Sequence, residues 1–310
     1  MDIQKVLITG AVGLIGSSLV EQLLQKGVQV VKLDSRIPVG SLGHGDIRNL
    51  SLLTELVKGC QGVIHLAAIS RVIWGEQNPQ LCWEINVQGT SNILKAAYQS
   101  ESCPWFIFGS SREVYGQQAI LPVTEQATIS PLNTYAHCKV EGEKLVNEYR
   151  QRGLVTAILR FSSVYGSAYD HADRVIPAFC RAAVKGSQMQ IEGLENSFDF
   201  THVSDVVNGI ICTMNKLQAG VEDLPPIHLT TGKGTSLMQV VRLVRDILEQ
   251  PVYYQEAPVR TYDVHRFCGN PDQAKKVLGW QAQVPFARGM EHLLKQYQHY
   301  FSLHDRAGIL

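Results

Sequence analysis

The sequence lacks any apolar run that approaches the length of a membrane span. Met1 and Asp2 lead directly into the first predicted strand, which leaves no room for a secretory signal. The chain also lacks a charge excess, because 28 basic and 28 acidic side chains cancel and no stretch concentrates lysine and arginine. This balance argues against a nucleic-acid or membrane partner. We therefore expect a soluble, cytoplasmic protein.

The seven cysteines form an odd, scattered set with no Cys-x-x-Cys pair. Such usage fits reduced thiols in the cytosol better than a disulfide framework or a zinc site. His65 lies inside an apolar run and has no second histidine at metal spacing, so we interpret it as a packed core residue rather than a ligand or base. The sequence therefore predicts no metal site.

The first half of the chain alternates short β-rich runs with segments of helical periodicity. Strands with few polar residues are typical of a parallel sheet that helices cover on both faces. The sequence predicts an α/β fold, a doubly wound parallel sheet, with residues 1–166 as the first domain. Residues 167–310 are expected to form mainly a smaller C-terminal substrate-binding domain, with about 199–232 returning to the sheet. The predicted strands are Lys5–Thr9, Val28–Leu33, Gly62–Ala67, Trp105–Ser110 and Val155–Arg160, and the predicted helices include Leu14–Gln25, Gln88–Ser100, Leu237–Glu249 and Asp272–Leu278.

Three glycines punctuate the junction between the first strand and the first helix. Gly10 permits a tight turn, Gly13 lets the backbone approach a pyrophosphate, and Gly16 allows close packing of the helix on the strand. A glycine triplet alone also suits any sharp strand-to-helix turn. Asp34 ends the second strand about twenty residues further on, where a carboxylate can accept hydrogen bonds from a ribose diol and repel a 2′-phosphate. We expect NAD rather than NADP, although Arg36 could instead pair with a phosphate.

Tyr135 and Lys139 stand four residues apart in a predicted helix over Thr134–Arg150, so they share one face. A free phenol has a pKa of about 10 and is a poor base near neutral pH. An ammonium ~4 Å away at an effective dielectric constant of ~20 favours the phenolate by up to ~4 kcal/mol. This pairing indicates acid/base chemistry by the tyrosine, coupled to hydride transfer with a nucleotide cofactor.

Further motifs follow in order along the chain: Asp46, His65-Leu-Ala-Ala68, Asn86-Val-Gln-Gly-Thr90, Ser110-Ser-Arg-Glu-Val-Tyr-Gly116 and Tyr135-x-x-x-Lys139. Together with the glycine turn they resemble the extended short-chain dehydrogenase/reductases, and most closely the NAD-dependent sugar-nucleotide epimerases and dehydratases. The resemblance runs from about residue 3 to Trp280. It implies a Rossmann domain that retains NAD, a carboxyl-terminal substrate domain, and often a homodimer built on the helices that carry Asn86 to Ser100 and Tyr135 to Arg150.

The resemblance also assigns a cofactor-binding set. Asp46 and Ile47 match the pair that touches the adenine, Asn86 is expected to place its amide on backbone near the cofactor, and Lys139 is expected to hold the nicotinamide ribose. The full expected set is Gly10, Gly13, Leu14, Ile15, Gly16, Asp34, Ser35, Asp46, Ile47, Leu66, Ala67, Ala68, Asn86, Tyr135 and Lys139.

By the same resemblance Ser111 is the catalytic hydroxyl, Tyr135 the base and Lys139 its partner. Dehydratases of the family usually carry Asp-Glu after the catalytic threonine, whereas this chain carries Arg112 and Glu113. Arginine stays protonated and cannot act as a general acid. Glu113 remains a candidate base, or alternatively a supporting carboxylate.

The second half departs from the family pattern where a nucleotide diphosphate is usually bound. Ser163 replaces an asparagine, and Phe198 replaces an arginine. A phenyl ring cannot satisfy a diphosphate. Arg260 and Asp263 resemble a second clamp, which could hold the anion alone or with Arg174. The expected substrate-binding residues are Ser111, Arg112, Ser163, Arg174, Arg260 and Asp263.

The intact set of serine, tyrosine and lysine, without the dehydratase acid, favours an NAD-dependent nucleotide-sugar epimerase. The leading hypothesis is a UDP-sugar 4-epimerase that works through a 4-keto intermediate. A 4,6-dehydratase, decarboxylase or reductase of the same family stays open as an alternative. A non-catalytic NAD-binding sensor is a lesser alternative, because such proteins commonly lose the tyrosine that this chain keeps.

Overall fold

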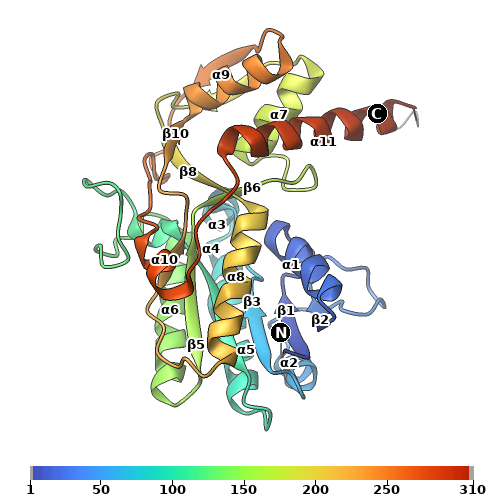
Figure 1. Cartoon of the computed structure of the whole chain (residues 1–310), viewed down its shortest axis with the longest axis vertical. Helices are drawn as coiled ribbons and strands as arrows, with labels where there is room; N and C mark the ends of the chain where they lie inside the picture. Colours follow the sequence, from blue (N-terminus) through green and yellow to red (C-terminus); the bar gives the residue numbers. More distant parts are fainter. Residues whose placement is uncertain (1–2, 307–310) are drawn as a thin grey trace.

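The computed structural model describes residues 3–306. A parallel sheet of six strands, in the order β2-β1-β3-β4-β5-β9, forms the lower part of the molecule in Figure 1. The chain runs from β1 outward to β2 and then crosses back to β3 on the other side of β1. Ligands bind at such a reversal, outside the carboxyl ends of the strands. The strands are β1 (Lys5–Thr9), β2 (Gln29–Leu33), β3 (Gly62–His65), β4 (Trp105–Ser111), β5 (Thr156–Phe161) and β9 (Ile227–Leu229).

Helices cover both faces of this sheet. Successive strand residues point to opposite faces, and nearly all of them are buried in β3 and β4, so both faces must be covered. Leu7, Val63 and Phe106 belong to one apolar cluster with α2 (Leu50–Val57), α5 (Gly89–Tyr98) and α6 (Thr134–Gln151). Their strand neighbours Ile8, Ile64 and Ile107 point to the opposite face. There they join α1 (Leu14–Gln25), α8 (Val203–Gln218) and α10 (Asp272–Leu278). The sheet is therefore doubly wound, as predicted.

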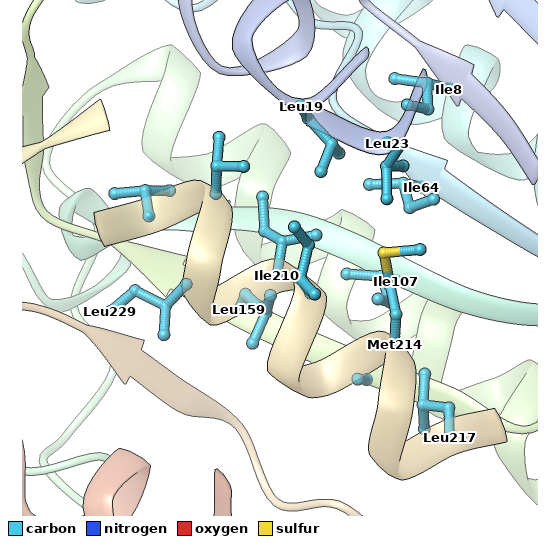
Figure 2. Close-up of a cluster of buried hydrophobic side chains, with 14 of the residues drawn as sticks. Ile8, Leu19, Leu23, Ile64, Ile107, Leu159, Ile210, Met214, Leu217 and Leu229 are labelled. Atoms are coloured by element: carbon cyan, nitrogen blue, oxygen red, sulfur yellow. The ribbon is translucent and has the colours of Figure 1, made fainter. Parts of the chain in front are cut away.

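Helix α8 covers the centre of that second face although it lies far along the chain. Figure 2 shows its Ile210 and Met214 lying against Ile107 and Leu159 of the sheet, close to Leu23 of α1. The segment that follows β8 (Ser197–His202) thus contributes a helix, α8, to the cover of the main sheet and a strand, β9, to the sheet itself.

A third apolar cluster lies at the carboxyl end of the sheet, in the upper part of Figure 1. Its helices are α7 (Val175–Lys185), α9 (Leu237–Leu248) and α11 (Phe286–Arg306). A three-stranded sheet, β10-β8-β6, and a two-stranded sheet, β11-β7, complete this region. These strands are β6 (Ser163–Tyr165), β7 (Met189–Glu192), β8 (Ser197–His202), β10 (Gly234–Ser236) and β11 (Tyr254–Ala257).

Short helical segments sit beside the carboxyl edge of the main sheet. They are α3 (Val72–Gln77), α4 (Pro79–Trp83), the π-helical η1 (Glu84–Gln88) and the 3-10 helix η2 (Arg112–Tyr115). Within residues 3–306, we find no helix that combines the length and the apolar character needed to cross a membrane.

Candidate active site

A cavity of about 680 Å³ lies between the carboxyl edge of the main sheet and the third apolar cluster. The glycine turn after β1, the loops after β2 and β3, the end of β4 and the inner face of α6 form its wall on the sheet side. Segments before and within α7, β7, β8 and the 260–264 loop form the opposite wall. The structure brings every predicted site residue to this lining except Asn86.

The glycine turn has the geometry that the sequence predicts. Gly10 has a φ of +73°, and a Cβ there would lie 2.7 Å from the Ala67 nitrogen on the loop after β3. A Cβ on Gly16 would lie 2.0 Å from the Gly10 carbonyl oxygen, so only glycine lets α1 start this close to the turn. Within residues 3–306 no side chain caps the start of α1 at Gly13. Its first N–H groups are therefore suited to an anion.

The Asp34 carboxylate is fixed at the end of β2. It accepts hydrogen bonds from the Val12 amide at 3.1 Å and from the Arg36 amide at 3.0 Å, and Arg36 Nε lies 3.2 Å from Oδ1. Burial opposes ionisation, but the hydrogen bonds from Arg36 and Val12 outweigh it and hold the pKa of Asp34 below its ordinary value. Asp34 is therefore an ionised acceptor beside the turn, and Arg36 is its ion-pair partner.

Asp46 is held in a similar way, but nearer to the solvent. Its carboxylate pairs with Arg48 at 2.7 Å, and hydrogen bonds from Arg48 hold the pKa of Asp46 below its ordinary value. The neighbouring Ile47 is buried and lines the cavity.

His65 is a packed core residue, as predicted. Its Nδ1 lies 2.7 Å from Thr9 Oγ1 and its Nε2 lies 3.0 Å from Thr90 Oγ1, so both ring nitrogens have partners. Burial lowers the pKa of His65 to about 3, which keeps the ring neutral at physiological pH.

Asn86 lies in the π-helical segment η1, and its side chain is hydrogen-bonded to the loop after β3. Its Oδ1 accepts a hydrogen bond from the Ile69 amide at 2.8 Å, and its Nδ2 donates to the Ile69 carbonyl at 3.0 Å. Ile69 lines the cavity. Asn86 thus shapes the wall by holding Ile69.

Ser111, Tyr135 and Lys139 meet at the junction of β4 and α6. Asn133 caps α6 by accepting a hydrogen bond from the Ala136 amide at 2.8 Å, which fixes the first turn that carries Tyr135. The Tyr135 hydroxyl is hydrogen-bonded to Ser111. Lys139 Nζ donates to the Gly109 carbonyl at 2.6 Å and lies 5.8 Å from the Tyr135 ring centroid. All three side chains are buried at the cavity wall.

The charge state of the phenol differs from the sequence-based expectation of a lowered pKa. Burial raises the pKa of Tyr135 to about 12, and the hydrogen bond to Ser111 opposes this only in part. Burial also lowers the pKa of Lys139 to about 8. The expected lowering of the Tyr135 pKa is wrong because Tyr135 and Lys139 are both desolvated and the ammonium donates to the Gly109 carbonyl.

Arg112 and Glu113 face each other rather than acting separately. Arg112 Nη2 lies 2.8 Å from Glu113 Oε1, and the guanidinium carbon lies 5.0 Å from the Phe198 ring centroid. The other Glu113 oxygen accepts a hydrogen bond from Asn133 Nδ2 at 3.2 Å. Both carboxylate oxygens are thus engaged, which makes Glu113 a supporting carboxylate in this arrangement.

The predicted anion-binding arginines differ in how fully they are paired. Arg260 lies 2.6 Å from Glu192 and 2.9 Å from Asp263, so two carboxylates already surround it. Among the residues that the structure describes, Arg174 pairs with a single carboxylate, that of Asp170, which lies at the longer distance of 3.6 Å. Arg174 is therefore the better candidate for an incoming anion. Ser163 lines the same cavity.

A bridge between the two walls of the cavity was not predicted from the sequence. Arg71, on the loop after β3, lies 3.1 Å from the Asp173 carboxylate and donates to the Asp173 carbonyl at 2.8 Å. Arg174 Nη2 donates to Ser70 at 3.1 Å. These residues are more than a hundred positions apart and lie outside any motif, so the sequence carried no signal for them.

The residues present fit a dinucleotide. The turn presents uncapped N–H groups at the start of α1, an ionised Asp34 stands where a ribose diol would bind, and the cavity continues to Tyr135 and Lys139. A Cβ at Gly10 or Gly16 would strike backbone, so the close approach is built into the fold.

Comparison with known proteins agrees with this geometry. The model of the NAD dependent epimerase/dehydratase family matches residues 6–224. The UDP-glucose 4-epimerase of Halalkalibacterium halodurans is 28% identical, over 97% of this chain and 98% of its own length. The uncharacterized UDP-glucose epimerase YtcB of Bacillus subtilis is 33% identical, over 78% of this chain and 82% of its own length.

Among solved structures, MoeE5 in complex with UDP-glucuronic acid and NAD is similar throughout. It has a TM-score of 0.87 and 30% identity, and the match covers 96% of this chain and 99% of MoeE5. The match of the family model over residues 6–224, together with the glycine turn and the Ser111, Tyr135 and Lys139 junction, shows that the chain belongs to the NAD dependent epimerase/dehydratase family.

Proposed function

We propose that this protein is an NAD-dependent UDP-sugar 4-epimerase. The observation that carries the proposal is the meeting of Ser111, Tyr135 and Lys139 at one end of a cavity whose other end is the glycine turn with Asp34. The relatives named UDP-glucose 4-epimerase match nearly the whole chain, which supports the same reaction class.

In the proposed reaction, Tyr135 takes the proton from the sugar O4 hydroxyl while the C4 hydrogen leaves with its electron pair. NAD, when bound, accepts that hydride and later returns it. Ser111 aligns the sugar hydroxyl, and Lys139 contributes a positive charge one helical turn from Tyr135. The 4-keto sugar then turns, hydride returns to the opposite face of C4, and Tyr135 returns the proton to O4, so that no atom is gained or lost.

The state of Glu113 supports epimerisation over dehydration. Loss of water from C5 and C6 needs an available acid and base beside the sugar. Here Arg112 takes the place of the acid, and Glu113 is engaged by Arg112 and Asn133. A carboxylate with both oxygens occupied is a poor proton acceptor.

Substrate binding is proposed to involve Arg174 for the diphosphate, since its ion pair is longer than the two ion pairs of Arg260. Arg112, Ser163, Arg260 and Asp263 are proposed to surround the rest of the nucleotide sugar. UDP is the proposed nucleotide because it is the one that the relatives' names share.

The experiment is incubation of the purified protein with UDP-glucose, UDP-galactose and their N-acetyl and uronic counterparts, followed by chromatography of the products. The proposal predicts interconversion of at least one pair of C4 epimers without net consumption of NAD. A 4-keto-6-deoxy product, or the absence of any epimer, would reject it.

We also infer a cytoplasmic homodimer with a cofactor domain and a substrate domain. The two larger apolar clusters on either side of the cavity support the division into domains. Trp83 on α4 and Tyr98 on α5 are 43% and 45% exposed, which supports an interface on the α5 and α6 side. Size-exclusion chromatography with light scattering tests the dimer, and replacing Tyr98 by glutamate should yield monomers.

A further inference from the structure

Behind the catalytic face of α6 lies a buried ion pair that the proposed reaction does not use. Glu143 is 7% exposed and Arg160, on β5, is 5% exposed. Arg160 Nε donates to Glu143 Oε1 at 2.9 Å and Nη2 donates to Oε2 at 2.7 Å, so the pair is bidentate. Such a pair is weak evidence of stabilisation, because desolvation of two charges offsets their attraction. Its position relative to the catalytic groups suggests another role.

Helix α6 contacts three consecutive residues at the end of β4, one through each of three side chains. Lys139 donates to the Gly109 carbonyl at 2.6 Å, Glu143 accepts from the Ser110 hydroxyl at 2.5 Å, and Tyr135 is hydrogen-bonded to Ser111. Two of these side chains belong to the proposed catalytic set. The third side chain, Glu143, does not line the cavity, so a bound substrate or cofactor would not touch it.

The helix and the strand are also unusually close at this point. A Cβ on Gly142 would lie 2.5 Å from the Phe108 ring, so the helix backbone packs directly on a β4 side chain. Arg160 is the register partner of Ser110 on the neighbouring strand, and its Nη1 donates to Tyr115 at 2.5 Å and to the Glu125 carbonyl at 3.1 Å. The guanidinium is therefore anchored independently of Glu143.

We propose that Glu143, held by Arg160, is a positioning residue for the catalytic groups. It fixes the register of α6 against the end of β4, and so sets where the Tyr135 and Ser111 hydroxyls meet. It also places a negative charge one helical turn from the buried Lys139 ammonium. This inference rests on the proposed function for its catalytic consequence, but its effect on Lys139 can be measured without turnover.

The groups around Lys139 determine the sign of the electrostatic effect. Burial lowers the pKa of Lys139 to about 8, while Cys138 and Glu143 raise it. The hydrogen bond to Cys138 and burial raise the pKa of Cys82, so that thiol is neutral at this pH. Tyr135 and His65 are neutral at that pH, since the pKa of Tyr135 is raised to about 12 and that of His65 is lowered to about 3. Removing the Glu143 charge therefore lowers the pKa of Lys139 further and leaves the Arg160 charge uncompensated nearby.

The test uses Glu143→Gln, which keeps the shape and an oxygen acceptor but removes the charge. The matched control is Glu148→Gln, an exposed glutamate on the same helix. NAD affinity is titrated by fluorescence quenching across the pH range, and kcat and KM are measured with the sugar that the wild type epimerises. The melting temperature is recorded for each protein.

We expect NAD affinity of the wild type to weaken with a midpoint near the Lys139 pKa of about 8, and the midpoint to move to lower pH in Glu143→Gln. At mildly acid pH, where Lys139 is protonated in both proteins, NAD affinity and KM should match the wild type. There kcat should fall, by ~100-fold if the catalytic hydroxyls shift by about 1 Å. Glu148→Gln should change none of these values.

A folded Glu143→Gln protein with unchanged kcat and an unchanged midpoint overturns the proposal, and so does a lower melting temperature as the sole effect. If Glu143→Gln does not fold, the double variant Glu143→Leu with Arg160→Met replaces the pair by apolar side chains of similar size. Wild-type kcat in that variant also overturns the proposal. If the wild type binds NAD but epimerises no sugar, the proposed function fails while the NAD titration still tests Glu143.

Discussion

At the scale of single residues, sequence spacing located the proposed catalytic side chains but not their charge states. Tyr135 and Lys139 lie on one helix face as the four-residue spacing predicts, and Ser111 reaches the phenol from β4. The direction of the Tyr135 pKa could not be predicted, because it depends on burial and on the carbonyl that binds Lys139. Spacing in sequence carries no information on desolvation.

Replacing Tyr135 by phenylalanine removes one hydroxyl from a buried ring. Turnover should fall by a factor of ~100 or more, because proton transfer from the sugar hydroxyl is lost. NAD affinity and the melting temperature should stay close to those of the wild type. Turnover equal to that of the wild type would show that Tyr135 is not the acid/base.

The charge of Lys139 should lower the free energy of unfolding of the protein. Its pKa falls from 10.5 to about 8 on folding, which corresponds to a penalty of about 3 kcal/mol for the buried charge below pH 8. As the pH rises from 8 to 10.5 the unfolded chain binds more protons at this site than the folded chain, so the penalty is relieved. Lys139→Met should therefore unfold at a higher temperature than the wild type at pH 7, and be inactive.

Urea unfolding of both proteins at several pH values measures this effect. The difference in the free energy of unfolding should be largest at pH 7 and should shrink toward pH 10. A difference that stays constant over this range would mean that the Lys139 charge is not the source of the penalty.

At the scale of helices and strands, the sequence predicted best where the pattern is local. The bounds of β1, α1 and α10 match those predicted, since an apolar run and flanking glycine or proline signals define each of them. Helices α7, α8 and α11 were missed. Many α8 residues on several sides are buried between the sheet, α1 and α10, so its apolar pattern follows its neighbours rather than a single face.

The close packing of α1 against the glycine turn leads to a prediction about helix position and NAD binding. Gly16→Ala places a Cβ 2.0 Å from the Gly10 carbonyl, so the helix start must move away from the turn. We expect a loss of ~1–3 kcal/mol in stability and at least about tenfold weaker NAD binding. Ser17→Ala, one residue along on the exposed side, is the control that should keep both values. Equal NAD affinity in Gly16→Ala would contradict this account of the turn.

At the scale of the whole molecule, the cavity lies between the main sheet and the third apolar cluster and needs both for its walls. The sheet side of the site could be assigned from motifs because the turn, β4 and α6 lie in the first half of the chain in a fixed order. On the opposite wall, the resemblance indicated Ser163, Arg174, Arg260 and Asp263. The bridge between the walls could not be predicted, because Asp173 meets Arg71 only through the packing of α7 over the sheet edge.

The bridge between Arg71 and Asp173 should slow exchange of bound molecules. Arg71→Met removes it, and we expect release of NAD to accelerate by about tenfold, the equivalent of ~1.4 kcal/mol. Stopped-flow fluorescence measures this rate. Arg245→Met, which breaks an exposed pair with Asp246, should release NAD at the wild-type rate. A release rate of Arg71→Met that equals the wild type would exclude the bridge as a barrier.

The most direct test of the hydride account is to run the reaction in deuterium oxide and analyse the sugar product by mass spectrometry. If the C4 hydrogen leaves and returns as hydride while Tyr135 handles only the hydroxyl proton, the epimer will carry no deuterium on carbon. Deuterium at C5 or C6, or a 4-keto-6-deoxy product, would contradict it.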